Sequence, residues 1–207
     1  MRRIALALLA AAPLAGCGLE DLRQPYPDRR FYDLRADRPG PAAAAPAAND
    51  ARLVVRRFRM SPRFEGAELV IRRDAVTWES DFYHAFLVAP AAILSEETRR
   101  WVAASGIFGQ VLEGGSLVEA THALEGTGAA LFADCSDAAS PRAVLEIHAV
   151  LVDVRDAPRP VFRRTYRREV PVPEAAPPAF VSGWSAGLAA ILGDLEKDLR
   201  GLPRGRR

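Results

Sequence analysis

The chain of 207 residues is poor in cysteine, in histidine and in long apolar runs. Two cysteines can close at most one internal disulfide, so the core must hold the fold. The 28 basic and 26 acidic residues give a net charge of +2, which excludes the strongly basic surface typical of nucleic-acid binding. The apolar run Ile4 to Leu14 is about half of the roughly 20 residues that a membrane-spanning helix needs.

The first sixteen residues have the three parts of an export signal: a basic pair, an apolar run and small residues. Cys17 follows directly. The sequence Leu14-Ala15-Gly16-Cys17 resembles the lipobox of bacterial lipoproteins, which implies that residues 1–16 are removed and that the sulfur of Cys17 carries a diacylglycerol. A transmembrane anchor and an ordinary secreted protein are the alternatives. The first needs a longer apolar run, and the second gives Cys17 no purpose.

Lipid on Cys17 predicts stable attachment to a membrane, since each buried methylene contributes about 0.8 kcal/mol and anchoring needs more than one chain. In the lipoprotein sorting rule of many Gram-negative bacteria, an Asp directly after the Cys holds the protein in the inner membrane. Gly18 stands there, which favours the periplasmic face of the outer membrane, while Glu20 and Asp21 keep the inner membrane as the alternative. With Cys17 used by lipid, Cys135 has no partner for a disulfide.

Composition divides the mature chain into a tether, one domain and a short tail. Residues 17–30 are polar and contain proline, which predicts a lipidated tether that reaches roughly 40 Å when extended. We expect the domain over 31–203, with a Pro/Ala-rich loop at 38–50, and a basic tail at 204–207. Phe31 to Leu34 is an aromatic strand candidate, and its place before that loop predicts that it docks outside the order of the main sheet.

Alternation of apolar and polar residues predicts the strands. The segments 68–73 and 76–79 are separated by turn residues, so we expect them to pair as a hairpin. The other predicted strands are 52–60, 107–112, 121–134, 142–156 and 160–170.

An apolar period near 3.6 predicts two helices. The first begins at Pro90, where a missing N–H does no harm, and ends at Gly106. The second follows Pro177-Pro178 and has one continuous apolar stripe: Phe180, Trp184, Leu188, Ile191, Leu195 and Leu199. Strands, a helix, more strands and a closing helix predict a single α+β domain. Its sheet is mixed or mostly antiparallel, and the two main helices pack on one face.

The sequence lacks the signatures of catalysis. It has no Gly-x-Ser-x-Gly elbow, no His-Glu-x-x-His pair and no phosphate-binding loop. Glu146 and His148 share one face of a predicted strand and could seed a metal or acid–base site, but an exposed or satisfied strand pair is the preferred interpretation. Cys135, beside Asp134, has no basic neighbour in the sequence that would lower its pKa. We therefore predict no enzyme activity, no cofactor and no metal site.

Aromatic and aliphatic residues run together from Phe82 to Val88, ahead of Pro90. Such a segment can be core. It can equally be a docking surface for a partner or a lipid, because exposed aromatic clusters usually mark interaction sites. Both interpretations stay open, and the second makes Phe82, Tyr83 and Phe86 the candidate docking residues.

Five segments follow one another along nearly the whole mature chain: Phe31 to Leu34 (FYDL) after the tether, Ser61 to Gly66 (SPRFEG), Asp81 to Phe86 (DFYHAF) with Pro90, Arg100 to Phe108, and Trp184 to Leu195. In this order they resemble the ABC-type transport auxiliary lipoproteins. The resemblance implies an outer-membrane lipoprotein that works with a mammalian-cell-entry-type substrate-binding protein and with an ABC permease and ATPase. Such systems move phospholipids or other hydrophobic molecules across the cell envelope, and ATP hydrolysis belongs to the partners. No catalytic residue carries over.

The resemblance makes this chain a docking or structural component, as a single copy or as a homo-oligomer. Cys17 would hold it at one membrane while the domain binds a partner that reaches from the other. The alternative function is that of an envelope lipoprotein that regulates a cell-wall synthesis enzyme by binding it, since that role also needs only a tether and an α+β domain.

Overall fold

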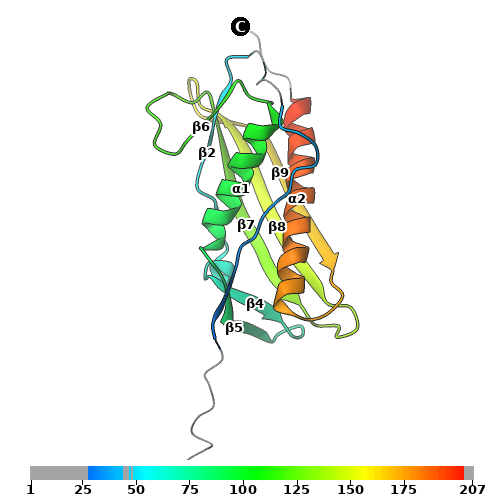
Figure 1. Ribbon diagram of the computed structural model, residues 1–207. Coiled ribbons are helices and arrows are strands. Elements are labelled where there is room, and N and C mark those ends of the chain that lie inside the picture. The colour runs from blue at the N-terminus through cyan, green and yellow to red at the C-terminus, as the bar shows by residue number, and fades with distance from the viewer. Residues whose placement is uncertain (1–27, 44–46, 48, 203–207) are drawn as a thin grey trace, which may run out of the picture.

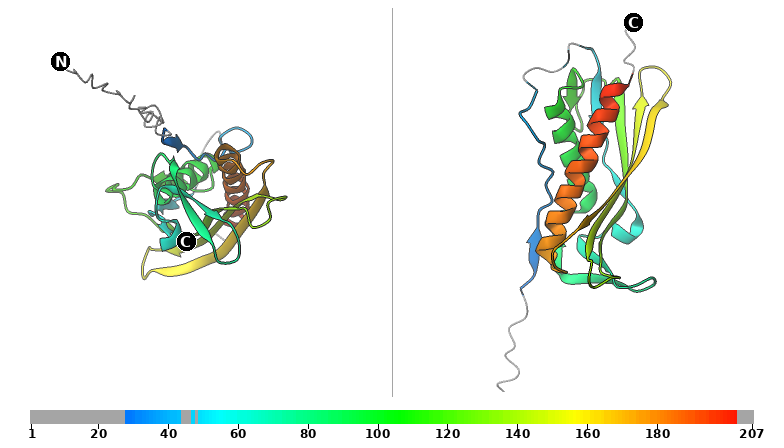
Figure 2. Two further views of the ribbon diagram at one scale, coloured as in Figure 1. Left: turned by 90° about the horizontal axis from the view of Figure 1, so that it is seen from below. Right: turned by 90° about the vertical axis from the view of Figure 1, so that its right-hand side faces the viewer.

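The computed structural model describes residues 28–43, 47 and 49–202. The predicted signal peptide, Cys17 and most of the tether, like the tail from residue 203, lie outside the described residues. The described chain forms one α+β domain, in which a curled nine-stranded mixed sheet holds two helices on one face (Figure 1 and Figure 2). This arrangement confirms the predicted fold class.

The secondary structure follows the predicted order. Helix α1 spans Pro90–Ser105, α2 spans Pro177–Gly201, and a short 3-10 turn, η2, spans Pro62–Phe64. The strands are β1 Arg30–Tyr32, β2 Arg52–Val55, β3 Arg59–Met60, β4 Glu68–Arg72, β5 Trp78–Phe86, β6 Gln110–Leu112, β7 His122–Asp134, β8 Arg142–Asp153 and β9 Arg159–Pro171.

Strand β7 is the centre of the sheet. One of its edges pairs with β8, which pairs with β9, and these neighbours are antiparallel. The other edge is shared by three shorter strands in succession: β2 at the start of β7, β3 in the middle and β4 at the end, each parallel to β7. Beyond β2 lies β6, and beyond β4 lie β5 and then β1. The sheet is mixed because an antiparallel meander and a set of parallel strands share β7.

Helix α2 packs on β8 and β9 with the predicted stripe inward. All six stripe residues are buried, and the indole N–H of Trp184 donates to the carbonyl oxygens of Phe132 and Val144 at 3.3 and 3.2 Å. Gly183 permits the close packing, since a Cβ there would lie 2.7 Å from the Cβ of Ala143. A fully buried apolar side chain contributes about 1.5–3 kcal/mol, so the stripe is a main source of stability.

Both predicted ends of α1 are confirmed. The helix begins at Pro90, and Gly106 follows its last residue with a left-handed φ of 65°, which glycine adopts without strain. The strand predicted at 107–112 is shorter than expected and begins at Gln110, because Ile107 and Phe108 are buried in the core before the strand starts.

The strand predicted at 52–60 is interrupted and forms β2 and β3. The backbone N–H of Phe58 donates to Oγ of Ser95 in α1 at 2.8 Å, instead of continuing the pairing with β7. The ring of Phe58 occupies the place where a side chain at Gly126 would lie. This tertiary contact overrides the alternation of the sequence. The strand predicted at 76–79 is longer than expected, and as β5 it continues to Phe86.

Residues 31–34 dock on the domain as predicted, but the expectation that they lie outside the order of the main sheet is wrong, because β1 is a strand of that sheet. Strand β1 pairs in parallel with β5 at the edge of the sheet, and Leu34, just beyond the strand, is buried. Residues 33–43, here called the crossing segment, then run over the helices on the side away from the sheet (Figure 2). The described part of the Pro/Ala-rich loop has neither helix nor strand, as expected.

Polar contacts hold the crossing segment on the helices. Arg38 donates two hydrogen bonds to Glu196 of α2, at 3.0 and 2.9 Å, and the N–H of Ala36 donates to Glu97 of α1 at 2.7 Å. The indole N–H of Trp101 and the guanidinium of Arg200 also donate to Glu196, both at 2.8 Å. Glu196 therefore joins the two helices and the crossing segment.

Candidate functional site

Strand β5 contains a bulge at residues that the sequence singles out. Glu68 of β4 is opposite Ala85 of β5. The next residue of β4, Leu69, is opposite Asp81. Residues 82–84 therefore have no opposite residue in β4, and the strand departs from the regular ladder there.

The carboxylate of Asp81 holds the bulge in place. One of its oxygens accepts the backbone N–H groups of Tyr83 and His84 at 3.0 and 3.1 Å, and the other lies 2.8 Å from Nδ1 of His84. The ring of His84 lies beside that of Tyr32 in β1, with 5.9 Å between centroids. Bonds from an Asp side chain to the following backbone define a local turn, so the bulge has a definite shape.

The bulge places two aromatic rings in solvent. Phe82 is 66% exposed and Tyr83 is 36% exposed, and their rings meet edge to face with 5.4 Å between centroids. Phe31 of β1, 55% exposed, lies on the same side, because the guanidinium carbon of Arg29 is 5.4 Å from the ring centroids of both Phe31 and Phe82. Phe31, Phe82 and Tyr83 are called the aromatic surface below.

Phe86 does not belong to this surface, which corrects the set of three candidate docking residues. It is 2% exposed, and its ring lies 5.7 Å from that of Trp184 between centroids. Beyond the bulge β5 is again paired with its neighbours, and Phe86 turns into the core. Leu87 and Val88, which follow the strand, are exposed. The segment 82–88 thus contains both core and surface residues: the core interpretation holds for Phe86, and docking stays a prediction for the exposed residues.

Phe31 and Arg29 belong to the site although the sequence pattern did not indicate them as docking residues. A signal for the bulge was present in the sequence: Phe82 and Tyr83 are consecutive and directly follow Asp81. Two consecutive side chains of a regular strand point to opposite faces, and an Asp favours a local turn.

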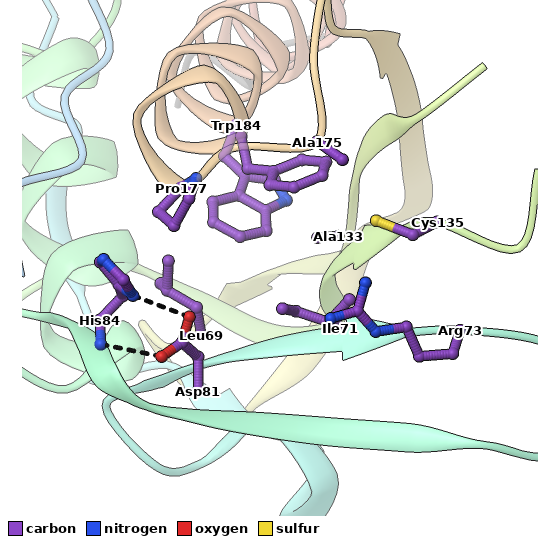
Figure 3. A pocket seen from close by; sticks show the side chains of 11 residues that line it. Leu69, Ile71, Arg73, Asp81, His84, Ala133, Cys135, Ala175, Pro177 and Trp184 are labelled. Carbon is purple, nitrogen blue, oxygen red and sulfur yellow. Dashed lines mark hydrogen bonds and ion pairs between the residues drawn. The ribbon is translucent and has the colours of Figure 1, made fainter. Parts of the chain in front are cut away.

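A cavity of about 180 Å³ lies next to the bulge, between the β4–β5 pair, the end of β7 and the first turn of α2 (Figure 3). Side chains from distant parts of the chain line it, so no local pattern could have indicated it. Its apolar wall includes Leu69, Ile71, Ala133, Phe180 and Trp184.

Polar groups also line this cavity. The Asp81–His84 pair stands on one side, and on the other the guanidinium of Arg73 lies on the same side as Cys135 (Figure 3). Nε of Arg73 donates to Glu79 at 2.7 Å, in an ion pair whose two side chains are about half exposed. The thiol of Cys135 is partly buried, and this burial raises its pKa, so the thiol stays protonated at neutral pH.

Glu146 and His148 lie on the solvent side of β8. Nε2 of His148 is 2.9 Å from one carboxylate oxygen of Glu146, and Arg167 donates to the other at 2.9 Å. The hydrogen bond from Arg167, followed by that from His148, lowers the pKa of Glu146, so its carboxylate is charged and paired. Among the described residues, no group of three or more His, Cys, Asp or Glu side chains is placed to hold a metal ion.

The predicted lipidation site, Cys17, lies outside the described residues, 11 positions before Asp28, where the described chain begins. In the part of the chain that the structure describes, no helix has both the length and the apolar character needed to cross a membrane.

No protein-family model and no curated protein matches the chain. Solved structures do match it. One is the crystal structure of protein XCC0632 from Xanthomonas campestris, which is described with the family model DUF330. It is 16% identical to this chain, with a TM-score of 0.65, and the match covers 80% of this chain and 92% of that one. A second crystal structure, of an uncharacterized protein, is 12% identical with a TM-score of 0.66, over 83% of this chain and 99% of that one. At these identities the likeness shows a shared fold.

Proposed function

We propose that this protein is a membrane-anchored auxiliary lipoprotein of an ABC and mammalian-cell-entry-type system, and that it docks a partner through the aromatic surface. Such a system moves phospholipids or other hydrophobic molecules across the cell envelope. The place of the aromatic surface supports this function: Phe31 and Phe82 lie beside Arg29, where the tether enters the domain. The resemblance of the sequence segments to the auxiliary lipoproteins supports it as well.

The proposal places the docking surface near one membrane. Cys17 precedes Asp28 by 11 residues. An extended chain covers at most about 3.5 Å per residue, so the connection spans roughly 40 Å at most. With lipid on Cys17, the aromatic surface stays within about that distance of the outer membrane, and a partner that reaches from the inner membrane meets it there.

The aromatic surface has the physical properties of a protein docking site. Large, rigid rings and arginine are enriched among the residues that contribute most binding energy. The rings are positioned before binding, since Asp81 fixes the backbone beside Phe82 and the pairing of Phe31 with Ala85 fixes β1 on β5. A surface that is already ordered loses less conformational entropy on binding.

The test is the double variant Phe82→Ala and Tyr83→Ala in the full lipoprotein. Affinity purification from membranes should recover the mammalian-cell-entry-type protein, the permease and the ATPase at least about tenfold less well than with the wild type, because two central aromatic contacts are lost. Far-ultraviolet circular dichroism should not change. Leu117→Ala is the matched control, since Leu117 is fully exposed in the loop after β6, at the opposite end of the domain from β5 (Figure 1).

Undiminished recovery of these partners by the double variant would remove Phe82 and Tyr83 from the interface. Recovery of a cell-wall synthesis enzyme in their place, with the same loss in the variant, would favour the alternative function of a regulatory lipoprotein.

A further inference from the structure

Docking at the aromatic surface leaves the neighbouring cavity without a role. The cavity of about 180 Å³ lies where the N-terminus of α2, the end of β7 and the β4–β5 pair meet (Figure 3). It is open partly because several residues around it have small side chains, namely Ala133, Ala175 and Pro177. The bulge at 82–84 also separates part of β5 from β4.

The inner wall of the cavity suits an apolar guest. Leu69, Phe180 and Trp184 are buried core residues, and the indole N–H of Trp184 is already bonded to backbone carbonyls. An engineered cavity of about 150 Å³ with Leu, Ile and Phe walls stays dry and binds benzene. The present cavity is slightly larger, so it has room for about six carbons of one acyl chain and not for a whole phospholipid.

The guanidinium of Arg73 is the group at the cavity that can bind an anionic head group. The carboxylate of Asp81 is already bonded to two backbone N–H groups and to His84. Arg73 faces the cavity, and its exposed ion pair with Glu79 is of the kind that contributes little, so its guanidinium can exchange partners. The N-terminus of α2, which begins at Pro177, adds the positive end of a helix dipole.

We propose that the cavity binds the end of one acyl chain of an anionic amphiphile, with the carboxylate or phosphate of the head group at Arg73. This inference rests on the proposed function, in which the protein serves the transport of hydrophobic molecules. It deepens that function by giving the domain a direct contact with the transported molecule.

Cys135 lines the cavity, so we expect its alkylation to slow when the cavity is occupied. At mildly alkaline pH, where a larger share of the thiol is ionised, the full lipoprotein in phosphatidylcholine nanodiscs is treated with N-ethylmaleimide, and peptide mass spectrometry follows the alkylation of Cys135. Octanoate at about ten times its half-protecting concentration should slow the alkylation roughly tenfold. Mono-octyl phosphate should protect similarly, whereas octylammonium should need a concentration about fivefold higher. Inorganic phosphate, which has no chain, should not protect.

Two test variants, with one control variant, assign the protection to this cavity. Ala175→Phe should fill its edge and abolish protection by octanoate. Ala190→Phe, the same change on an exposed position of α2, should leave protection unchanged. Arg73→Gln should remove the preference for octanoate over octylammonium, and it keeps the test open if Ala175→Phe does not fold.

Equal protection of the wild type and Ala175→Phe, or equal half-protecting concentrations of octanoate and octylammonium, would overturn the proposal. If the purified transport partner protected Cys135 from alkylation and octanoate did not, the proposal would also be overturned. The cavity would then be a site for a side chain of the partner protein. The octanoate experiment contains no partner protein. Its failure therefore leaves the docking proposal standing, and a failed docking test leaves octanoate binding measurable.

Discussion

The N-terminal part of the domain contacts the rest of the fold in two places. At the first its side chains are buried or paired, and at the second aromatic rings stay exposed. The crossing segment packs against the helices, where Ala36 is buried and Arg38 is paired with Glu196. At the bulge, β1 adds a strand to the sheet but leaves Phe31 exposed beside Phe82. Paired polar groups stabilise the first contact, whereas the second presents apolar rings to solvent. The first region therefore stabilises the fold, and the second is the proposed docking site.

The largest expected effect is at Phe86, on the core side of this division. Phe86→Ala should lower the free energy of unfolding by about 3–5 kcal/mol, because it removes a buried ring that packs against Trp184 and leaves a cavity. Urea unfolding followed by circular dichroism measures the change. A loss below about 1 kcal/mol would contradict the burial of Phe86 and return it to the candidate docking residues.

An intermediate effect is expected at Glu196, which anchors the crossing segment. Glu196→Gln should lower the free energy of unfolding by about 1–2 kcal/mol at neutral pH, because hydrogen bonds from Arg38 and Arg200 to a charged carboxylate become bonds to a neutral amide. Ser182→Ala, on an exposed position of the same helix, is the control that should change little.

The same variant tests the dependence on pH. The hydrogen bond from Arg38 is the main cause that lowers the pKa of Glu196 from its ordinary 4.5 to about 2 in the folded protein. A carboxylate whose pKa is lowered by folding stabilises the protein above its unfolded pKa, and this contribution is lost as the pH falls toward the folded pKa. The difference in stability between the wild type and Glu196→Gln should therefore shrink between about pH 4.5 and pH 2. A difference that stays constant over this range would show that the charge of Glu196 does not stabilise the contact.

The smallest expected effect is at Phe82, on the exposed side of the division. Phe82→Ala should change the free energy of unfolding by less than about 0.5 kcal/mol, because most of its ring is in solvent. The same urea experiment measures it beside Phe86→Ala. If the two variants proved equally unstable, the ring of Phe82 would be structural, and the aromatic surface would lose its basis as a docking site.

The helices were predictable because their signals are local. The stripe from Phe180 to Leu199 shows the helical period without any knowledge of its neighbours, and Pro90 and Gly106 mark the ends of α1 by their own backbone preferences. The interruption between β2 and β3 was not predictable in this way. It depends on the hydrogen bond of Phe58 with Ser95, which lies 37 residues away.

The candidate site was predictable only in part. The aromatic run drew attention to Phe82 and Tyr83, and both are exposed. The same run wrongly placed Phe86 among the candidate docking residues. The spacing of the aromatic residues does not show where the bulge ends and the regular pairing of β5 resumes. The cavity could not be predicted, because its walls come from β4, β5, β7 and α2.

By itself the sequence determined the α+β class and which segments form the two helices and the strands β7, β8 and β9, because apolar period, proline and glycine act within a few residues along the chain. It also contains the segment Leu14 to Cys17, and the prediction of lipid at Cys17 depends on the resemblance of this segment to a lipobox. Only the tertiary structure decided which aromatic rings of β5 are exposed and how the crossing segment packs over the helices. It also decided that a cavity lies between the start of α2 and the sheet. Strand register and contacts between distant segments are set by all the elements that pack together, and no short stretch of sequence contains that information.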